Sequence, residues 1–455
     1  MYLVTRTIIS AQDVLFPYFD ENGHKAQALY NAALFRIRQI FIGWDKSVRS
    51  ENEDGVFTEV SLLETAYPSI RVKRVISYSH LEKLMRVTEN PDFFSGLPMQ
   101  SAQAIIKSAC EDFSNWLKAL RAYKRDPSGF LGKPKMPGYK KPGLSATYTI
   151  TNQDALVYGT ELKLPRTKLR LRLGGIPESS RLMECRIKPY YGRYLVCLTF
   201  ETSDIEPDTD MPNIAAIDLG VDNIAAIVCT DGSSRLYKGG AILAENQLFA
   251  KRKATVVSDL TRGHKNRHYP STARMRDMSF HHANFDHDQC HKISRSITDY
   301  CTSHRAGLLV LGTNKGWKQK ACIGAANNQS FVGMPIAILR AMITYKAQAA
   351  GITVIEQEES YTSKADFLLG DHIPTYGKDD ADASFSGKRI GRGLYRSGNG
   401  TIINADLNGA ANILRKAIPD AWDRTKDYSF LNDPEVLGFH ELNPQSIPAK
   451  RIAAA

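Results

Sequence analysis

Hydrophobic and polar residues alternate one by one at the start of the chain and change to a helical spacing soon after. Residues 2–9 alternate apolar and polar side chains, which predicts a β-strand with one buried face. From residue 11 to about residue 125, apolar positions recur every three or four residues, as in residues 26–44 and 100–123, which predicts helices. We therefore expect a helical block, residues 11–125, inserted after a lone strand within residues 1–10.

The strand pattern returns after a basic segment. Residues 126–142 are rich in Gly, Pro and Lys, which excludes a regular element and predicts an extended basic loop, with a plain linker as the alternative. Between residues 148 and 200 the period is two again, and residues 161–173 alternate leucines with lysines and arginines, which predicts one strand with an apolar and a cationic face. Together with residues 1–10, residues 126–202 are expected to form a small β-barrel of the oligonucleotide-binding type.

The second half of the chain has a different order of elements. After an acidic linker, residues 203–212, the pattern predicts three short antiparallel strands that end near residue 238. Further along it predicts basic and amphipathic helices over residues 251–304, a strand at 308–311, a helix at 335–350, a strand at 353–357 and a helix at 406–417. This is the order of an RNase H-like sheet, so we expect an α/β domain over residues 213–417 and a tail over 418–455.

Composition narrows the class of protein. The 455 residues are enough for two or three domains. Lys and Arg number 59 against 48 Asp and Glu, and this net charge of +11 favours polyanionic partners, with simple solubility as the alternative. The seven cysteines include no CxxC pair, so neither a disulfide framework nor a zinc ribbon is predicted. No uncharged run is long enough to cross a bilayer, and we expect a cytoplasmic protein without a membrane partner.

Two aspartates carry the candidate chemistry. Asp218 follows the apolar residues 214–217, where a buried carboxylate is costly unless it is paired or metal-bound, and the strand contains no basic partner. Asp406 begins a predicted helix whose small residues allow close packing on a sheet. Two-metal phosphodiester cleavage requires acidic oxygens that converge on Mg²⁺ ions about 3.5–4 Å apart. The alternatives are a satisfied core aspartate and a helix-start acid that only complements the helix dipole.

The segments around both aspartates resemble one known family. Residues 217–223 are Ile-Asp-Leu-Gly-Val-Asp-Asn, residues 361–364 are Tyr-Thr-Ser-Lys, and residues 404–413 are Asn-Ala-Asp-Leu-Asn-Gly-Ala-Ala-Asn-Ile. This pattern resembles the RuvC core of TnpB, the transposon-encoded RNA-guided nuclease that is ancestral to type V CRISPR effectors. The loop at residues 132–135 and the basic strand after it are similar to the family's wedge domain. The helical insertion matches the family's recognition domain by position and length only.

The resemblance implies an RNase H-like RuvC nuclease domain that is preceded by a wedge β-barrel with an inserted helical recognition domain. Family members generally carry a second catalytic carboxylate as a Glu at the end of the fourth strand of the RuvC sheet. This chain departs from them, because the strand at residues 308–311 ends in Gly312 and no acidic residue occurs between Gly307 and Ile355. Either the nuclease is dead or another residue supplies the carboxylate.

The next acidic residues, Glu356, Glu358 and Glu359, cluster at the end of the adjacent strand. Neighbouring strands are about 4.8 Å apart, a gap that a Glu side chain spans. We expect Glu359 to complete the catalytic, Mg²⁺-binding set with Asp218 and Asp406. Glu358 is the second choice, because strand alternation lets only one of the two face the metal site. The alternative is that both are solvated charges at the end of a strand.

Most of the family carries a four-cysteine zinc ribbon before the last catalytic Asp, but residues 364–403 contain no cysteine, so we expect no zinc. This insertion keeps a basic run with one aromatic residue, which favours contact with a guide or target strand, with a solvated hairpin as the alternative. The residues expected to contact nucleic acid are Lys133, Lys135, Tyr139, Lys140, Lys141, Lys168, Arg170, Arg172, Lys251, Arg252, Lys253, Lys388, Arg389, Arg392 and Arg396.

The resemblance also implies a function: an RNA-guided, Mg²⁺-dependent DNA endonuclease, prokaryotic and associated with the nucleoid. A structured guide RNA would pair with one strand of double-stranded DNA beside a short flanking motif, and two Mg²⁺ ions would serve cleavage. The main alternative is a nuclease-dead, RNA-guided repressor of transcription, which Gly312 favours and the retention of both aspartates disfavours. A transposase that joins DNA ends by itself has no separate support in the sequence.

Overall fold

The computed structural model describes residues 1–176, 179–263, 269, 271–314, 333–378, 383–423 and 427–444. The chain forms two compact units, Met1–Asp204 and Ile205–Ala455. Each unit has a hydrophobic core of its own. None of the helices in these described ranges combines the length and the apolar character that a membrane span requires.

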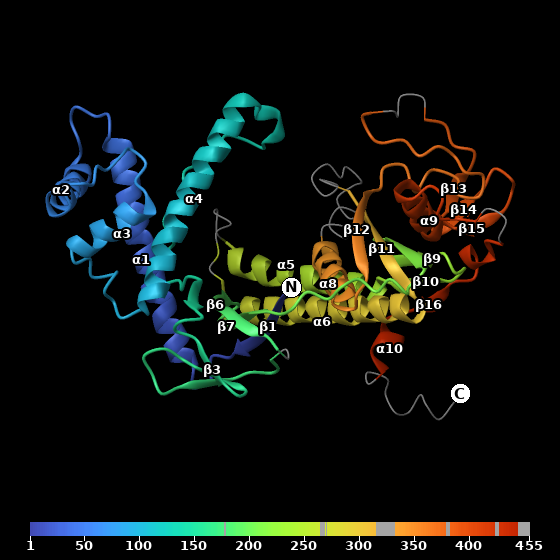
Figure 1. Cartoon of the computed structure of the whole chain (residues 1–455), viewed down its shortest axis with the longest axis horizontal. Coiled ribbons are helices and arrows are strands. Elements are labelled where there is room, and N and C mark those ends of the chain that lie inside the picture. The colour runs from blue at the N-terminus through green and yellow to red at the C-terminus, as the bar shows by residue number, and fades with distance from the viewer. Residues whose placement is uncertain are drawn as a thin grey trace. The chain divides into compact units, whose positions relative to one another are not determined.

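In the first unit, a block of four helices follows the first strand along the chain (Figure 1). Its order is β1 (Tyr2–Ile9), α1 (Phe16–Gly43), α2 (Glu51–Ala66), α3 (Tyr78–Val87) and α4 (Met99–Arg125). Local sequence sets the start of α2, where Ser50 and Glu53 form a capping box that satisfies free backbone N–H groups. The predicted strand at residues 2–9 and the helices that follow it are confirmed.

Strands from both sides of the helical block form one antiparallel sheet in the order β1-β7-β6-β2. Here β2 is Tyr148–Thr151, β6 is Arg181–Tyr190 and β7 is Arg193–Glu201. Tyr2 of β1 lies opposite Glu201 of β7, so the lone first strand joins the later strands as predicted. A second sheet contains β3 (Leu156–Tyr158), β4 (Glu161–Lys163) and β5 (Arg170–Arg172). Since the described pairings do not join the two sheets, the closed barrel stays a prediction.

The prediction of one strand over residues 161–173 is wrong. Its two ends are separate antiparallel strands, β4 and β5. Pro165 has no N–H to donate to a ladder, and Arg166 adopts a positive φ of 59°, so the chain turns between them. Leu162 and Leu171 still lie opposite each other and are buried. The alternation therefore predicted the apolar face correctly but not the turn.

The second unit is built on a six-stranded sheet in the order β12-β11-β8-β9-β10-β16. The antiparallel meander consists of β8 (Asn213–Asp218), β9 (Asn223–Cys229) and β10 (Ser234–Lys238). Strands β11 (Ala306–Thr313) and β12 (Thr353–Glu358) run parallel to β8 on its other side. This arrangement confirms the predicted RNase H-like sheet. The short edge strand β16 (Glu435–Leu437), parallel to β10, lies in the predicted tail and was not expected.

Helices cover both faces of this sheet (Figure 1). One core contains side chains of α5 (Gly240–Thr261), α6 (Ala273–Ser303) and α8 (Ile336–Ala349). The core on the other face contains α9 (Ala405–Ala417) and the small sheet of β13 (Lys388–Gly391), β14 (Leu394–Arg396) and β15 (Ile402–Asn404). Ile217 packs into the first core and Ala216 into the second. Because side chains alternate along a strand, Asp218 faces α9.

Candidate nuclease active site

Asp218 is the last residue of β8 and lies partly exposed beneath α9. The two approach closely at Gly409, since a β-carbon built there would lie 2.5 Å from Asp218 Oδ2. Only glycine therefore leaves room for this carboxylate between sheet and helix. Burial, then the negative charges of Glu359 and Asp406, raise the pKa of Asp218 from 3.8 to about 8, and the charge of Arg389 opposes the shift. Asp218 thus lies among carboxylates with too little positive charge around it.

Asp406 is placed by the start of α9. The side chain of Asn404 caps this helix and accepts hydrogen bonds from the backbone N–H groups of Asp406 and Leu407. Asn223, the first residue of β9, donates from Nδ2 to Asp406 Oδ2 over 2.7 Å. Arg389 Nη2 donates to Asp406 Oδ1 over 3.1 Å. These contacts hold Asp406 at the edge of the sheet where β8 ends.

Glu359 directly follows β12, and its N–H donates to Thr313 O, which extends the pairing with β11 by one residue. Its side chain reaches back over β11, because a β-carbon built on Gly312 would lie 2.8 Å from Glu359 Oε2. Burial and the charge of Glu358 raise the pKa of Glu359 from 4.5 to about 7. The carboxylate of Glu359 therefore occupies the space above Gly312, the last residue but one of β11, and β11 lies beside the strand that ends in Asp218.

Glu358 has a different environment. Its Oε2 accepts a hydrogen bond from Lys416 Nζ over 2.8 Å, and its Oε1 accepts one from Ser360 N over 2.6 Å. Burial opposes ionisation, but these two contacts outweigh it and hold the pKa of Glu358 below its ordinary value. Lys416 also donates to Ser360 O and Pro374 O. Glu358 is thus engaged in anchoring the segment after β12, which favours Glu359 as the third carboxylate of the cluster.

Two buried asparagines of α9 hold the turn that follows this third carboxylate. Asn412 Nδ2 donates to Thr362 O over 2.9 Å and to Ala365 O over 2.7 Å. Asn408 Nδ2 also donates to Ala365 O, and its Oδ1 accepts from Phe367 N. The sequence offered a signal for this role, the spacing of two asparagines four residues apart in a helix motif, but their bonding partners were not predicted.

Carboxylate oxygens are the ligands that Mg²⁺ prefers, and a cation would oppose the effect of burial and of the neighbouring negative charges, which raise the pKa of Asp218. As the side chains stand, however, the described residues contain no group of three or more His, Cys, Asp or Glu that could hold a metal ion. Arg389 instead forms an ion pair with Asp406 over 3.1 Å. The donor set suits Mg²⁺, but binding requires the carboxylates to rotate toward one another and Arg389 to release Asp406.

Hydrogen bonds organise the insertion in which family members carry cysteines. Asp366 is fully buried, and its Oδ2 accepts from Ser397 Oγ over 2.6 Å and from Gly398 N over 2.8 Å. The carboxylate of Asp371 accepts from Asp366 N and from both the N–H and the hydroxyl of Ser386. These two aspartates join the segment after the Tyr-Thr-Ser-Lys motif to the loops around β14. Sequence reasoning missed both residues.

The predicted nucleic-acid contacts are all exposed. In the first unit, the loop that carries Lys133, Lys135, Tyr139, Lys140 and Lys141 is bound to α1. Asn31 donates to and accepts from the backbone of Lys140, each over 2.8 Å, and Lys140 Nζ lies 4.0 Å from the ring centre of Tyr30. The segment is therefore docked on a helix, unlike a plain linker.

The other predicted contacts lie on several elements. Lys168 precedes β5, which carries Arg170 and Arg172. Lys251, Arg252 and Lys253 are on α5, and the remaining residues, Lys388, Arg389, Arg392 and Arg396, are on or beside β13 and β14. Of all these side chains, Arg389 alone bonds a member of the carboxylate cluster within the described residues. Contact with nucleic acid stays a prediction for each of them.

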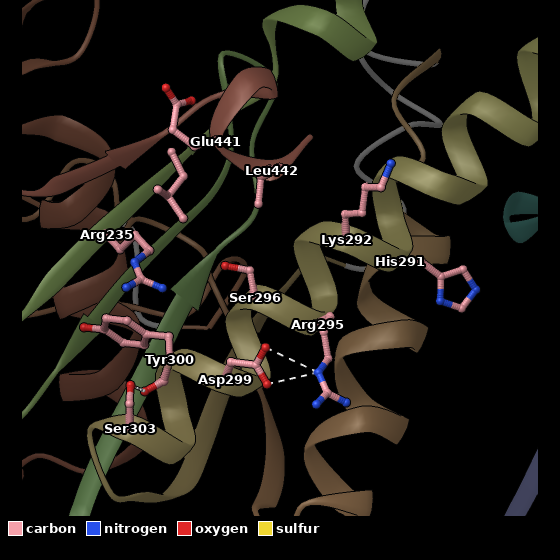
Figure 2. A pocket seen from close by; sticks show the side chains of 11 residues that line it. Arg235, His291, Lys292, Arg295, Ser296, Asp299, Tyr300, Ser303, Glu441 and Leu442 are labelled. Atoms are coloured by element: carbon pink, nitrogen blue, oxygen red, sulfur yellow. Dashed lines mark hydrogen bonds and ion pairs between the residues drawn. The ribbon is translucent and has the colours of Figure 1, made fainter. Parts of the chain in front are cut away.

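A pocket of about 700 Å³ between α6 and the C-terminal helix α10 (Phe439–Leu442) is not part of this site (Figure 2). Figure 2 shows an ion pair between two of its lining residues, Arg295 and Asp299. The end of α6 meets the start of β8, because Asn213 donates to His304 O, whereas Asp218 ends that strand. The pocket therefore lies toward the opposite end of the sheet from the carboxylates.

The second unit thus has the fold of the RNase H-like nucleases, with three carboxylates at one edge of its sheet. Residues 197–318 match the family model OrfB_IS605, described as a probable transposase, and residues 337–413 match the Cas12f1-like TNB domain. The first match includes Asp218, and the second includes Glu359 and Asp406. The chain is a relative of the TnpB proteins and of the compact type V CRISPR effectors, as its sequence motifs predicted.

Three relatives show how far the similarity extends. The chain is 25% identical over 239 residues to the CRISPR-associated endodeoxyribonuclease Cas12f2 of Micrarchaeota archaeon (strain CG1_02_47_40), over 50% of this chain and 40% of that protein. It is 28% identical over 230 residues to Cas12f1 of Sulfoacidibacillus thermotolerans, over 48% of this chain and 49% of that protein. It is 29% identical over 210 residues to the TnpB-like protein ORF457 of Acidianus two-tailed virus, over 45% of this chain and 42% of that protein. The matches span less than half the length of each relative.

Among solved structures, the chain is similar to one described as a Cas12f1–sgRNA–target DNA complex. The identity is 13%, the TM-score is 0.48, and the alignment covers 88% of this chain and 82% of that one.

Proposed function

We propose that the chain is an RNA-guided DNA endonuclease that pairs a guide RNA with target DNA beside a short flanking motif and cleaves the DNA at a RuvC-type site. The observation that supports the proposal is that Glu359, which follows β12, and Asp406, on α9, both act electrostatically on Asp218 at the end of β8. Burial, and after it the charges of Glu359 and Asp406, raise the pKa of Asp218, so both of these acids interact with Asp218 although they are far from it in the sequence. Acidic groups with strongly raised pKa values are typical of catalytic and metal-binding sites.

In this proposal Asp218, Glu359 and Asp406 hold two Mg²⁺ ions. The ions would activate the attacking water and neutralise charge on the phosphate, and the cut would leave a 5′-phosphate and a 3′-hydroxyl. The protein's own contribution is to position the ligands. Asn223 orients Asp406 and is itself held by Lys238 Nζ, which donates to Asn223 Oδ1 over 3.0 Å.

The second contribution of the chain to this chemistry is to influence whether Asp218 is protonated. Asp218 has to release its proton before it can act as a ligand, and the charge of Arg389 favours this release because it lowers the pKa. Once Asp406 is released to a metal ion, the guanidinium of Arg389 is free to meet a phosphate, for which its planar set of N–H donors is suited.

The exposed basic residues support a nucleic-acid partner, since a net charge of +11 and basic residues beside aromatic rings suit the phosphates and bases of a nucleic acid. Within the proposal, residues 1–10 and 126–202 form the wedge domain and residues 11–125 the recognition domain. These would bind the RNA scaffold and the flanking duplex, while residues 213–417 cut the DNA. Two of the relatives are named endodeoxyribonucleases, which supports the same reaction.

The test is plasmid cleavage in Mg²⁺ by the full chain co-expressed with the RNA of its native locus. The wild type should cut a plasmid that carries the guide-matched sequence, and Asp218→Ala should not. Asp222→Ala is the matched control and should still cut, because Asp222 is an exposed aspartate four residues away whose nearest ion pair is Arg392 at 3.8 Å. Tight, guide-dependent binding of the plasmid by a wild type that leaves it intact would instead favour the RNA-guided repressor, the reading that Gly312 supports.

A further inference from the structure

Gly312 lies near the end of β11, where the resemblance to TnpB implies a glutamate, and its surroundings leave no room for a side chain. A β-carbon built on Gly312 would lie 2.7 Å from Ile413 Cδ1, 2.8 Å from Glu359 Oε2 and 3.3 Å from Ile217 O. Contacts of β-carbons under 3.0 Å are essentially absent from real proteins. One of the two crowding groups is the carboxylate that the proposed reaction uses.

The backbone of β11 cannot move aside to relieve this crowding. The strand is paired on both sides, with Leu311 opposite Ile217 of β8 and Gly312 opposite Gln357 of β12. One residue later, Thr313 O accepts a hydrogen bond from the N–H of Glu359. Because these ladders fix both main chains, a side chain at position 312 has to displace the side chains above it.

Of those side chains, the Glu359 carboxylate yields most easily. Within the described residues it has neither a hydrogen bond nor an ion pair, whereas Glu358 is held by Lys416 and Ser360. The charge of Arg340 attracts it without such a contact, so its position depends mainly on the open space over Gly312. Ile413, by contrast, is fully buried in the core between the sheet and α9.

We propose that Gly312 is a positioning residue for the nuclease site. The space over the end of β11 accommodates one carboxylate, which either position 312 or position 359 can supply, but not both. Glycine at position 312 keeps this space open, so that the carboxylate can come from Glu359 at the end of β12. This inference rests on the proposed nuclease function and adds a residue that touches neither metal nor DNA.

The swap between the two positions tests the inference in the full ribonucleoprotein. Glu359→Gly should abolish plasmid cleavage, and the double variant G312E/E359G should regain at least a tenfold higher rate than Glu359→Gly. Gly312→Ala alone should lower the cleavage rate at least tenfold. Metal binding provides the second readout, because the rise in Tm on adding excess Mg²⁺ should shrink in Gly312→Ala and return in the swapped variant.

The double variant G312A/I413V separates the crowding of Glu359 from that of Ile413. Valine lacks the Cδ1 atom, so this variant keeps only the clash with Glu359 and should remain impaired while its Tm without metal recovers. Full cleavage by Gly312→Ala or by G312A/I413V, or a swapped variant no better than Glu359→Gly, would overturn the inference. A wild type that fails to cut would instead refute the nuclease proposal itself, so the two failures are distinguishable.

Discussion

Lys416 donates a hydrogen bond to Glu358 over 2.8 Å and thereby separates the roles of two adjacent glutamates. Lys416 is nearly buried, with 9% of its side chain exposed, and it also bonds the backbone of the segment after β12. Glu358 thus serves the structure of the turn, while Glu359 beside it reaches the carboxylate cluster. Four predictions follow from this site and its supports.

Glu359→Gln should abolish plasmid cleavage, and Glu358→Gln should keep it within about twofold of the wild type. Loss of a metal-binding carboxylate should lower the cleavage rate by more than the roughly 10–100-fold that follows when a residue that only orients a metal ligand is altered. Glu358→Gln loses only its charge-assisted bond to Lys416, which should lower the free energy of unfolding by about 1 kcal/mol in urea titrations. Cleavage retained by Glu359→Gln but lost in Glu358→Gln would assign the third ligand to Glu358.

Arg389→Gln should move the acid side of the pH–rate profile of cleavage to higher pH, by roughly 0.5–1 unit. The reason is that the charge of Arg389 lowers the pKa of Asp218, so its removal makes the proton harder to release. Arg392→Gln is the control, since this residue lies on the same hairpin and pairs with Asp222. An unchanged acid side in Arg389→Gln would show that the guanidinium does not govern this proton.

Asp218→Asn should stabilise the metal-free protein at alkaline pH. The pKa of Asp218 rises from 3.8 to about 8 on folding, so the native state holds a proton that the unfolded chain has lost between these values. The contribution of Asp218 to the free energy of unfolding is fully present below its unfolded pKa of 3.8 and is lost as the pH rises through its folded pKa of about 8. Melting in a chelator should show Asp218→Asn gaining roughly 5 °C over the wild type near the upper value.

That gain should shrink toward the acid end of the same pH range, where Asp218 is protonated in the unfolded wild-type chain as well as in the native state. Excess Mg²⁺ should reverse the order, because the wild type alone keeps the carboxylate that binds it. Equal melting temperatures of the two proteins at all pH values would contradict the raised pKa.

Asn412→Ala should destabilise the second unit by about 1–3 kcal/mol, because the carbonyl group of Thr362 loses its side-chain donor and, among the described residues, that of Ala365 keeps only the side-chain donor of Asn408. Asn399→Ala is the matched control, since Asn399 is exposed and accepts one hydrogen bond, from Thr401 N, within the described residues. Its cost should stay below about 0.5 kcal/mol. Urea unfolding of both variants measures the difference, and similar small losses would argue against the anchoring role of Asn412.

Periodicity alone was enough to predict most of the elements. Local patterns determine strands and helices over short windows, and the order of those elements indicated an RNase H-like sheet before any contact was known. The failure over residues 161–173 has a local cause as well, since alternation continued across Pro165 and hid the turn between β4 and β5. The unexpected strand β16 is only three residues long, too short for a period to be read.

Asp218 and Asp406 could be singled out in the sequence because each lies in a motif whose residue types are unusual for their positions. The choice between Glu358 and Glu359 was not decidable in the same way, since neighbours in a chain share the same local pattern. The tertiary structure distinguishes them, because Lys416 of α9 bonds Glu358, whereas the carboxylate of Glu359 lies in the open space over Gly312.

The sequence by itself determined the elements, their order and the two aspartates, because these depend on neighbours within a few residues. Only the tertiary structure distinguishes the environments of Glu358 and Glu359 and shows which glycines leave room for carboxylates. Those outcomes depend on strand register and on the packing of α9, which bring together Gly312 and Glu359, and Asp218 and Gly409, across long stretches of chain.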